Sequence, residues 1–518
     1  MRARRVVVWG IFGGLIAALC GCREGEATPR GDVVDTPVGT TPAEAMGRWQ
    51  VQARPSPELD RVRVQMCFEG WVPPRLEAQN PLVGAALRDV VHVPVAGDTA
   101  PEVLAVDGGA VALTGLQVGD CAAYTVDLAS MLASAAIGVP GRMRMRAFRY
   151  GSDLMLSPDY WLLRPAEPDG DRPAPHMQGS FELPPGLRAL VPWPLVEGGD
   201  RERGPFDIPR TTFAWRIHGA MGRFDVDELD VGASHLRVAA LGDGWGVERA
   251  RLLAWIEASA RAVAGLYQGF PVPSAQVILV PVSGRQVVFG NAAQGGGAGV
   301  AIMVGTEVTA EALAEDWVAV HELLHLGMPM VEDAGDWLSE GLATYYQPVV
   351  QARAGAMSAR AAWERLHDGF GRGRSRSSGR TLRAESRDMG ETHQYWRVYW
   401  AGAAIALIAD VEMRTRGGSL DQQVRAIRAC CLDAPYTWSV DGLLARVSAP
   451  ERGPGLAETA ARYLDLREFP DLAETYRALG LGFDDAGRLV EVSDDEAARR
   501  LRVAIMGSEA VPRPPAEG

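Results

Sequence analysis

Residues 321–325 read H-E-L-L-H, so two histidines stand four positions apart with a glutamate directly after the first. On an α-helix, residues with this spacing lie on one face, about one turn from each other. Two neutral imidazoles in that position can bind a single Zn²⁺. Glu322 lies one step round the helix, where it can take a proton from water without binding the metal. The motif predicts a hydrolytic metal site with His321 and His325 as ligands.

A third ligand is offered by residues 337–343, which read W-L-S-E-G-L-A. The carboxylate of Glu340, carried by the next helix, would complete a set of two histidines and one carboxylate with a fourth position left open. The simpler alternative is a buried helix whose histidines only form hydrogen bonds. That alternative suits a single histidine, but the pair together with Glu322 and Glu340 favours metal binding.

The first of these helices has recognisable ends. Thr309 can cap its start, and Gly327 and Pro329 mark a stop just past His325. Apolar residues recur between these ends at helical spacing and form one face: Leu313, Trp317, Val320 and Leu324. We therefore expect one helix from Thr309 that carries the H-E-L-L-H motif at its C-terminal end.

The second helix must bring Glu340 back toward the histidines. Asp336 can cap its start, and Pro348 should end or kink it near Gln347. If the two helices pack antiparallel, Glu340 can approach His325.

The two motifs together resemble the zinc-binding segments of gluzincin metallopeptidases. The W-L-S-E-G-L-A stretch is similar to the second zinc-ligand segment of the aminopeptidase N and glycyl aminopeptidase families. Residues 399–421 begin with Y-W-A-G-A and end with G-G-S-L-D, and this stretch resembles the glycyl aminopeptidase family. The resemblance covers residues 236–483 and implies a zinc peptidase with a thermolysin-like, mainly helical catalytic domain.

The resemblance also implies a role for each residue of the site. Zn²⁺ would be bound by three residues: His321, His325 and Glu340. Glu322 would be the general base. Tyr399 would stabilise the oxyanion of the tetrahedral intermediate, because a phenol is a neutral donor that can point at developing negative charge. Tyr395 is the rival for this role, and an aromatic residue in a helix core is the alternative reading of Tyr399.

The G-A-M-E-N motif of exopeptidases is absent from the chain. Residues 295–299, G-G-G-A-G, occupy the equivalent place in a predicted edge strand. A glycine-rich edge, with Gly296 and Gly297 as candidate substrate-binding residues, suits the close approach of a peptide backbone. It lacks a glutamate to hold a free amino terminus, and an ordinary flexible loop is an equal alternative.

The chain has 518 residues, 47% of them hydrophobic and 23% charged, which predicts a folded protein of two or three domains. A formal net charge of −13 argues against a general nucleic-acid binder. Expected partners are a peptide or protein substrate and a membrane.

A targeting segment opens the chain, because residues 1–5 are basic and residues 6–19 are apolar. The following L-C-G-C resembles a bacterial lipobox with Cys22 as the lipidated residue. We expect attachment by lipid at the extracytoplasmic face of the cell envelope, in the periplasm or at the outer membrane if the cell has one. Plain secretion is the alternative.

The remaining cysteines can pair in an exported protein. Cys67 and Cys121 both fall in the N-terminal region and are candidates for a disulfide, with two separately buried thiols as an equal alternative. Cys430 and Cys431 are adjacent on a predicted helix, and we expect them to be buried or unpaired rather than joined to each other.

The expected fold class is α+β, with an N-terminal β-sandwich followed by the helical catalytic domain. The expected order is signal peptide (1–22), tether (23–45), β-rich domain (46–180), linker (181–210), α/β part with an edge strand (211–308), helical zinc-binding part (309–483) and C-terminal tail (484–518). Within the α/β part we expect strands at 212–217, 276–282 and 287–304 and a helix at 247–267. Residues 371–390 are rich in arginine and serine and predict either a disordered loop or a lid that favours acidic substrates.

These observations predict a lipid-anchored zinc peptidase, with an aminopeptidase as the candidate activity. Two alternatives stay open: an endopeptidase, and a binding or scaffold lipoprotein whose peptidase fold has lost activity.

Overall fold

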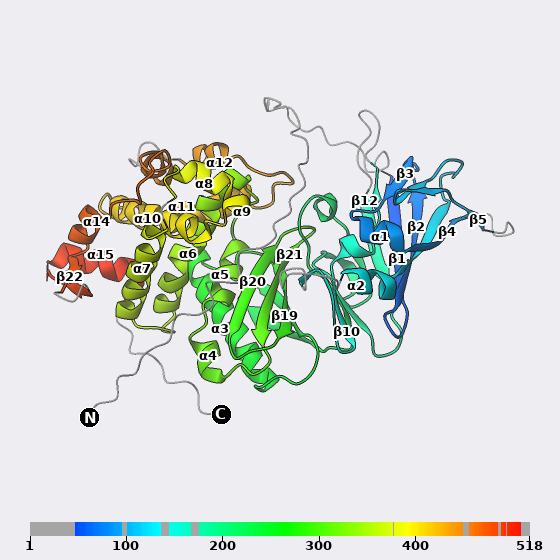
Figure 1. Cartoon of the computed structure of the whole chain (residues 1–518), viewed down its shortest axis with the longest axis horizontal. Coiled ribbons are helices and arrows are strands. Elements are labelled where there is room, and N and C mark those ends of the chain that lie inside the picture. Colours follow the sequence, from blue (N-terminus) through cyan, green and yellow to red (C-terminus); the bar gives the residue numbers. More distant parts are fainter. Residues whose placement is uncertain are drawn as a thin grey trace.

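The computed structural model describes residues 47–95, 101–135, 145–166, 176–376, 378–448, 455–484, 488–493 and 495–508. The predicted signal peptide, the tether and Cys22 lie outside these residues. Strands dominate the first part of the described chain and helices the last part (Figure 1). The expected mixture, sheets first and a mainly helical C-terminal part, is therefore confirmed. No helix among the described residues has the length and apolar character needed to cross a membrane.

The N-terminal part is built on an eight-stranded sheet whose central strands alternate buried and exposed side chains. Its order is β14 (Leu195–Asp200), β15 (Gly204–Asp207), β12 (His176–Phe181), β1 (Arg48–Pro55), β2 (Arg61–Glu69), β8 (Cys121–Asp127), β4 (Leu87–Val93) and β5 (Glu102–Val103). In the antiparallel β2–β8 pair, Cys67 stands directly opposite Cys121 and the two form a disulfide.

Two four-stranded sheets complete this part. One has the order β13 (Arg188–Leu190), β16 (Ala220–Gly222), β10 (Asp153–Leu156), β9 (Ala147–Tyr150), and the other has the order β11 (Arg164–Pro165), β3 (Arg75–Glu77), β7 (Ala110–Ala112), β6 (Val106–Asp107). Short helices lie between the strands: α1 (Pro81–Ala86), α2 (Leu128–Ala135) and the 3₁₀ turns η3 (Pro158–Tyr160) and η4 (Arg210–Phe213). The predicted strand at 212–217 is wrong, because the chain makes η4 there: Thr212 is buried and its hydroxyl accepts a hydrogen bond from the Trp193 indole.

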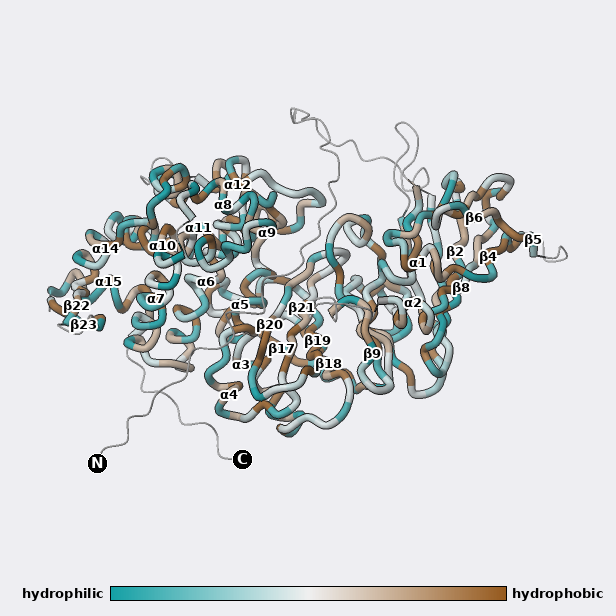
Figure 2. Tube along the Cα trace, in the orientation of Figure 1, coloured by the Kyte–Doolittle hydropathy of each residue, from teal (hydrophilic) through white to brown (hydrophobic). Residues whose placement is uncertain are grey.

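The next sheet positions the candidate site. Its order is β17 (Val226–Val231), β18 (Ser234–Ala240), β19 (Ser274–Val282), β21 (Ala298–Gly305) and β20 (Val287–Ala293). The strands β18, β19 and β21 run parallel, and the two edge strands, β17 and β20, run antiparallel to their neighbours. In Figure 2 hydrophobic stretches of the tube gather where these strands lie.

Both faces of this sheet are covered. Leu279 and Ile302 point into the large core that also contains α3 (Arg249–Tyr267) and the later helices. Ile278 and Met303, one position along, point into a second core shared with the N-terminal sheet β13–β16–β10–β9. This alternation explains why the strands at 276–282 and 298–305 read as unbroken apolar runs.

Helices make up most of the remaining chain. They are α4 (Ala310–Ala314), α5 (Val318–His325), η5 (Asp333–Gly335), α6 (Asp336–Arg353), α7 (Ala359–Arg374), α8 (Leu382–Arg387), α9 (Met389–Thr392), α10 (Tyr395–Arg414), α11 (Leu420–Cys431), α12 (Val440–Val447), α13 (Leu456–Ala461), α14 (Ala473–Ala478) and α15 (Glu496–Met506). A small hairpin, β22 (Leu481–Phe483) and β23 (Leu489–Glu491), lies among the last of them.

Several details of the helical part differ from expectation. Pro348 does not end α6, which continues to Arg353. Residues 341–352 are all buried, so packing on every side holds the helix together where proline removes one backbone hydrogen bond. Cys430 and Cys431 are joined in a disulfide, so the prediction that these neighbours are not joined is wrong. They are the last two residues of α11.

Candidate metal centre

The H-E-L-L-H motif occupies the last turns of α5. This helix is shorter than predicted, because the chain breaks between α4 and α5. The carboxylate of Asp316 accepts hydrogen bonds from the backbone N–H groups of Val318 and Ala319, both at 3.0 Å, and so starts a new helix. His321 and Glu322 are buried on α5, 4% and 8% exposed, so neither is a surface residue that faces bulk water.

Helix α6 carries Glu340 back to the histidines. The predicted cap is wrong: the N-cap is Gly335, and Asp336 is the first helical residue. Instead, the Ser386 hydroxyl of α8 accepts a hydrogen bond of 3.0 Å from the backbone N–H of Trp337. The start of α6 is thus held by a side chain fifty residues further along the chain.

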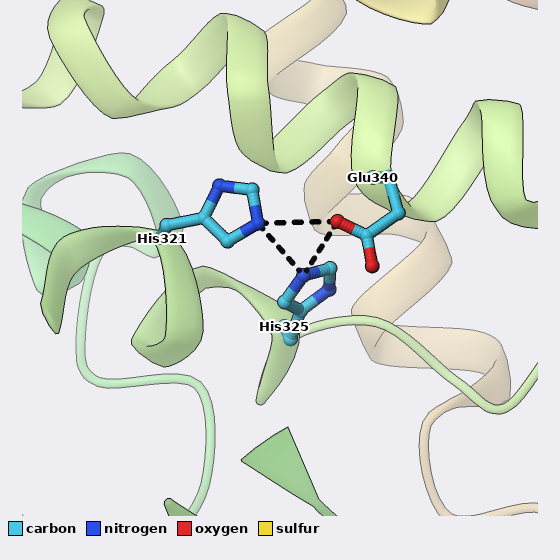
Figure 3. A group of neighbouring side chains, drawn as sticks. All are labelled: His321, His325 and Glu340. Carbon is cyan, nitrogen blue, oxygen red and sulfur yellow. Dashed lines mark hydrogen bonds and ion pairs between the residues drawn. The ribbon is translucent and has the colours of Figure 1, made fainter. Parts of the chain in front are cut away.

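Three side-chain atoms converge between α5 and α6 (Figure 3). His321 Nε2 lies 3.1 Å from Glu340 Oε2, His325 Nε2 lies 3.3 Å from His321 Nε2, and His325 Nε2 lies 3.4 Å from Glu340 Oε2. Ligands at the usual 2.0–2.1 Å from a tetrahedral zinc ion are about 3.3–3.4 Å from each other. The two imidazoles and the carboxylate therefore fit zinc in kind and in spacing.

The charges at the centre also favour a cation. Burial opposes a charge on His325, yet the Glu340 carboxylate beside it raises the pKa of His325 to about 9. Burial likewise opposes the charge of Glu340, but the charge of His325 and hydrogen bonds with both imidazoles hold the pKa of Glu340 well below its usual range. A partly buried carboxylate between two imidazoles thus stabilises positive charge at this point, which a divalent ion supplies.

The outer nitrogens of the two imidazoles differ in their surroundings. His325 Nδ1 lies 3.2 Å from the hydroxyl of Ser339, the residue before Glu340. When Nε2 faces the metal position, Nδ1 carries the proton and donates a hydrogen bond to this hydroxyl. His321 Nδ1 is buried and has no hydrogen-bond partner among the described residues. Ser339 therefore orients one of the two ligand rings.

Glu322 faces the edge strand β20. Its carboxylate accepts a hydrogen bond from the backbone N–H of Ala292, and burial raises its pKa above the usual value. A Cβ built on Gly290 would lie 2.3 Å from Cγ of Glu322, so only glycine leaves room for this side chain. Glu322 is therefore a buried carboxylate held between α5 and β20, and its raised pKa makes it a stronger base than an exposed glutamate.

Tyr399, on the first turns of α10, joins the centre from a third helix. Its ring lies nearly parallel to the His321 imidazole, with centroids 6.2 Å apart, and its hydroxyl forms a hydrogen bond with Glu340. Burial, and then the charge of Glu340, raises the pKa of Tyr399 well above its ordinary range, so the hydroxyl keeps its proton. Tyr395 lies beyond it, with its ring 6.4 Å from that of Tyr399 and its hydroxyl 3.4 Å from His393 Nδ1.

Gly296 and Gly297 do not lie in an edge strand, as predicted, but in the turn that joins β20 to β21. Both have positive φ, +78° and +141°, and a Cβ at Gly297 would lie 1.9 Å from the carbonyl oxygen of Pro192. The backbone that approaches these glycines is therefore that of the N-terminal part of the same chain. Just before the turn, Gln294 donates hydrogen bonds to the carbonyl oxygens of His325 and Met328 and ties the turn to the end of α5.

The described part of residues 371–390 includes the end of α7, all of α8 and the start of α9, so the predicted disordered loop is wrong there. Three of its arginines have partners within the fold: Arg372 lies over the Trp396 and Trp400 rings, Arg380 pairs with Asp388, and Arg383 pairs with Asp465. The role of this segment as a lid for acidic substrates stays a prediction.

Four residues of the centre were missed from the sequence. Ser339 stands beside Glu340 in the W-L-S-E-G-L-A motif, and a hydroxyl next to a ligand is a signal that could have drawn attention. Gly290, Ala292 and Gln294 have no such signal, because only the position of β20 beside α5 brings them to the site.

No protein-family model matches the chain, and no curated protein matches its sequence. Solved structures do resemble it. An aminopeptidase N family protein from Idiomarina loihiensis is 12% identical, with a TM-score of 0.61 over 87% of this chain and 82% of that chain. A mutant M1 zinc metallopeptidase from Deinococcus radiodurans is 17% identical, with a TM-score of 0.50 over 82% of this chain and 95% of that chain. The same figures hold for a two-domain M1 zinc metallopeptidase mutant bound to L-arginine.

At such low identities the likeness shows a shared fold. The resemblance to aminopeptidase N relatives is thereby confirmed at the level of fold. Activity and substrate do not follow from it.

Proposed function

We propose that the protein is a zinc-dependent peptidase that acts as an aminopeptidase. The observation that carries this proposal is the group His321, His325 and Glu340, whose ligand atoms all lie within 4.8 Å of one another. Glu322 stands beside them without belonging to the group, as a general base for hydrolysis must. The shared fold with M1 zinc metallopeptidases is consistent with this chemistry.

The residues of the chain have separate tasks in this mechanism. Zinc, when bound, lowers the pKa of water and polarises a carbonyl group. Glu322 takes a proton from the attacking water and later returns it to the leaving amine. The Tyr399 hydroxyl, protonated and close to Glu340, donates a hydrogen bond to the oxyanion as negative charge develops. The N–H of Ala292 keeps the Glu322 carboxylate in its place through the cycle.

The test is the substitution Glu322→Gln. The amide cannot accept the proton, so peptide hydrolysis should fall by at least about 1,000-fold while one zinc per chain is retained. Elemental analysis measures the zinc content. Hydrolysis is measured with a library of peptides that have free amino ends. Glu315→Gln, which removes an exposed carboxylate near the start of α5, is the matched control and should be fully active. Activity that survives Glu322→Gln contradicts the mechanism, and zinc-loaded wild-type protein that cleaves no peptide favours a scaffold role.

The same library, used with free and N-acetylated peptides, distinguishes an aminopeptidase from an endopeptidase. An aminopeptidase cleaves peptides with a free amino end and leaves their N-acetylated forms intact, whereas an endopeptidase cleaves both.

We further propose that the enzyme is held at the extracytoplasmic face of a membrane by lipid on Cys22. The apolar segment and the L-C-G-C sequence support this proposal. Cys22→Ser should move the protein from the membrane fraction to the soluble fraction and abolish labelling with a radioactive fatty acid. Retention of both properties would contradict it.

A further inference from the structure

Asp336 does not have the structural role predicted for it, that of the cap of α6. As the first residue of α6 it was expected to cap the helix, but Gly335 occupies the cap position. The Ser386 hydroxyl takes the hydrogen bond of the Trp337 N–H instead. Asp336 is half-buried, and its carboxylate has no hydrogen bond or ion pair with the described residues. Burial and the charges of four residues act on it: Glu340, Asp333, His325 and Arg216.

The carboxylate of Asp336 lies on the side of α6 that faces the metal centre. Asp336 precedes Glu340 by four residues, so the two share one face of the helix. Its charge acts on His325 of α5 and on Tyr399 of α10 as well. Because its charge acts on groups of three helices that surround the metal centre, the Asp336 carboxylate lies beside that centre.

The turn at residues 295–297 lies close to the same place. Gln294 holds this turn against the end of α5 at His325. The N–H of Gly295 donates a hydrogen bond of 2.8 Å to the carbonyl oxygen of Arg216, whose charge acts on Asp336. This is the turn in which the sequence offers glycines and no glutamate to hold an amino terminus. Asp336 is a carboxylate beside the metal centre, on the same face of α6 as Glu340.

We propose that Asp336 binds the positively charged amino end of the peptide substrate. The inference rests on the proposed peptidase function and names the group that makes the enzyme an aminopeptidase. Electrostatics agree with it, because burial, followed by the charges of Glu340 and Asp333, raises the pKa of Asp336 to about 7. A carboxylate that its own protein leaves without a close partner gains most from a substrate ammonium group beside it.

The test measures binding rather than cleavage. Tetra-alanine with a free amino end and its N-acetylated form are titrated by calorimetry into zinc-loaded Glu322→Gln protein and into the double variant Glu322→Gln/Asp336→Asn. Loss of a charge-assisted hydrogen bond should weaken binding of the free peptide by about 10- to 100-fold and leave the acetylated peptide unchanged. An acetylated peptide that begins with lysine shows whether a side-chain ammonium group can replace the amino end, and we expect no effect of Asp336→Asn on it.

The double variant Glu322→Gln/Glu315→Gln is the matched control, because Glu315 is an exposed acid that is not among the charges acting on Asp336. It should change the binding of neither alanine peptide. Equal weakening of the free and acetylated alanine peptides by Asp336→Asn, or no weakening of either, would overturn the proposal, as would an effect confined to the lysine peptide. Failure of the peptidase function would show separately, as absence of cleavage or of zinc in the wild-type protein.

Discussion

Two tyrosines compete for the role of oxyanion donor, and their positions at the start of α10 separate them. Tyr399 stacks on His321 and bonds to Glu340, whereas Tyr395 lies one turn earlier beside His393. The contacts with the ligand residues that the structure shows are those of Tyr399. The residue that the family resemblance favoured is therefore also the one that geometry favours.

We predict that Tyr399→Phe lowers kcat by about 100-fold, because one preorganised donor to the oxyanion is lost. Zinc content should stay at that of the wild type, since the phenol is not among the three ligand atoms. Steady-state kinetics and metal analysis of the same preparation test this. Tyr395→Phe is the control and should keep kcat within a few-fold. A larger loss in Tyr395→Phe than in Tyr399→Phe would reverse the assignment.

The individual ligands could be predicted from the sequence, but the use of Asp336 could not. His321, His325 and Glu340 follow from spacing on two helices, because the helix itself fixes which side chains share a face. Asp336 reads as a helix cap, since aspartate is common there. Whether a carboxylate turns to its own helix or to a neighbouring site depends on which other acceptors compete for the backbone N–H groups at the start of the helix. Here the competing acceptor is the hydroxyl of Ser386 in α8, which no local pattern reveals.

At the scale of elements, a close crossing of two helices brings Glu340 and Tyr399 together. Gly341 of α6 meets Gly402 of α10, and a Cβ on Gly402 would lie 2.0 Å from the carbonyl oxygen of Trp337. These glycines belong to the W-L-S-E-G-L-A and Y-W-A-G-A motifs. Each motif therefore provides a site residue and, beside it, the glycine that lets the other helix approach.

The edge strand β20 offers a second test at this scale. Gly290→Ala places a methyl group 2.3 Å from Cγ of Glu322 and 2.9 Å from Cγ1 of Val318. The Glu322 side chain must shift, and we predict that kcat/KM falls by about 10- to 100-fold with zinc still bound. Gly299→Ala in the next strand is the control, because its methyl group comes no closer than 3.3 Å to its nearest neighbour, the Gln276 side chain. Equal activity of the two variants would show that β20 does not position Glu322.

The secondary structure was foreseeable where an apolar run or a helical period dominates. The strands β19 and β21 and the helix α3 are of this kind. The sequence at 212–217 also alternates between polar and apolar residues, yet its first residues form η4. Thr212 is buried there, because its hydroxyl accepts a hydrogen bond from the Trp193 indole and packs against the turn at Gly296. The break before α5 arises from the Asp316 carboxylate, a local competition between two possible caps that periodicity does not resolve.

At the scale of the whole molecule, one hydrophobic core joins the N-terminal part to the sheet that carries β20. Met155 and Leu190 from the first part meet Ile278 and Met303 from the second. The unbroken apolar run at 276–282 predicts burial on both faces of its strand. Which segment covers the second face is set by contacts far apart in sequence, and the sequence alone does not identify it.

His218 lies at this joint. It is 3% exposed, and its Nε2 donates a hydrogen bond of 3.0 Å to the backbone carbonyl of Asn291 in β20. Gln276 of β19 in turn donates to the carbonyl oxygen of His218. A neutral, buried imidazole thus links the N-terminal part to the edge strand beside Glu322.

This link should make the protein sensitive to acid. Burial lowers the pKa of His218 to about 4, from 6.5 in an unfolded chain. Between these values the unfolded state binds more protons than the folded state, so stability is complete above about pH 6.5 and falls as the pH drops toward 4. The full shift in pKa corresponds to about 3 kcal/mol of unfolding free energy.

The variant His218→Gln keeps an N–H donor for Asn291 but cannot take up a proton. Between pH 7 and pH 4 its unfolding free energy should therefore fall by about 3 kcal/mol less than that of the wild type. Urea unfolding of both proteins at a series of pH values measures the difference between their unfolding free energies. Protonation of the metal ligands affects both proteins equally and cancels in this difference. If both proteins lose the same stability over this range, His218 is not the group that makes the joint between the two parts acid-sensitive.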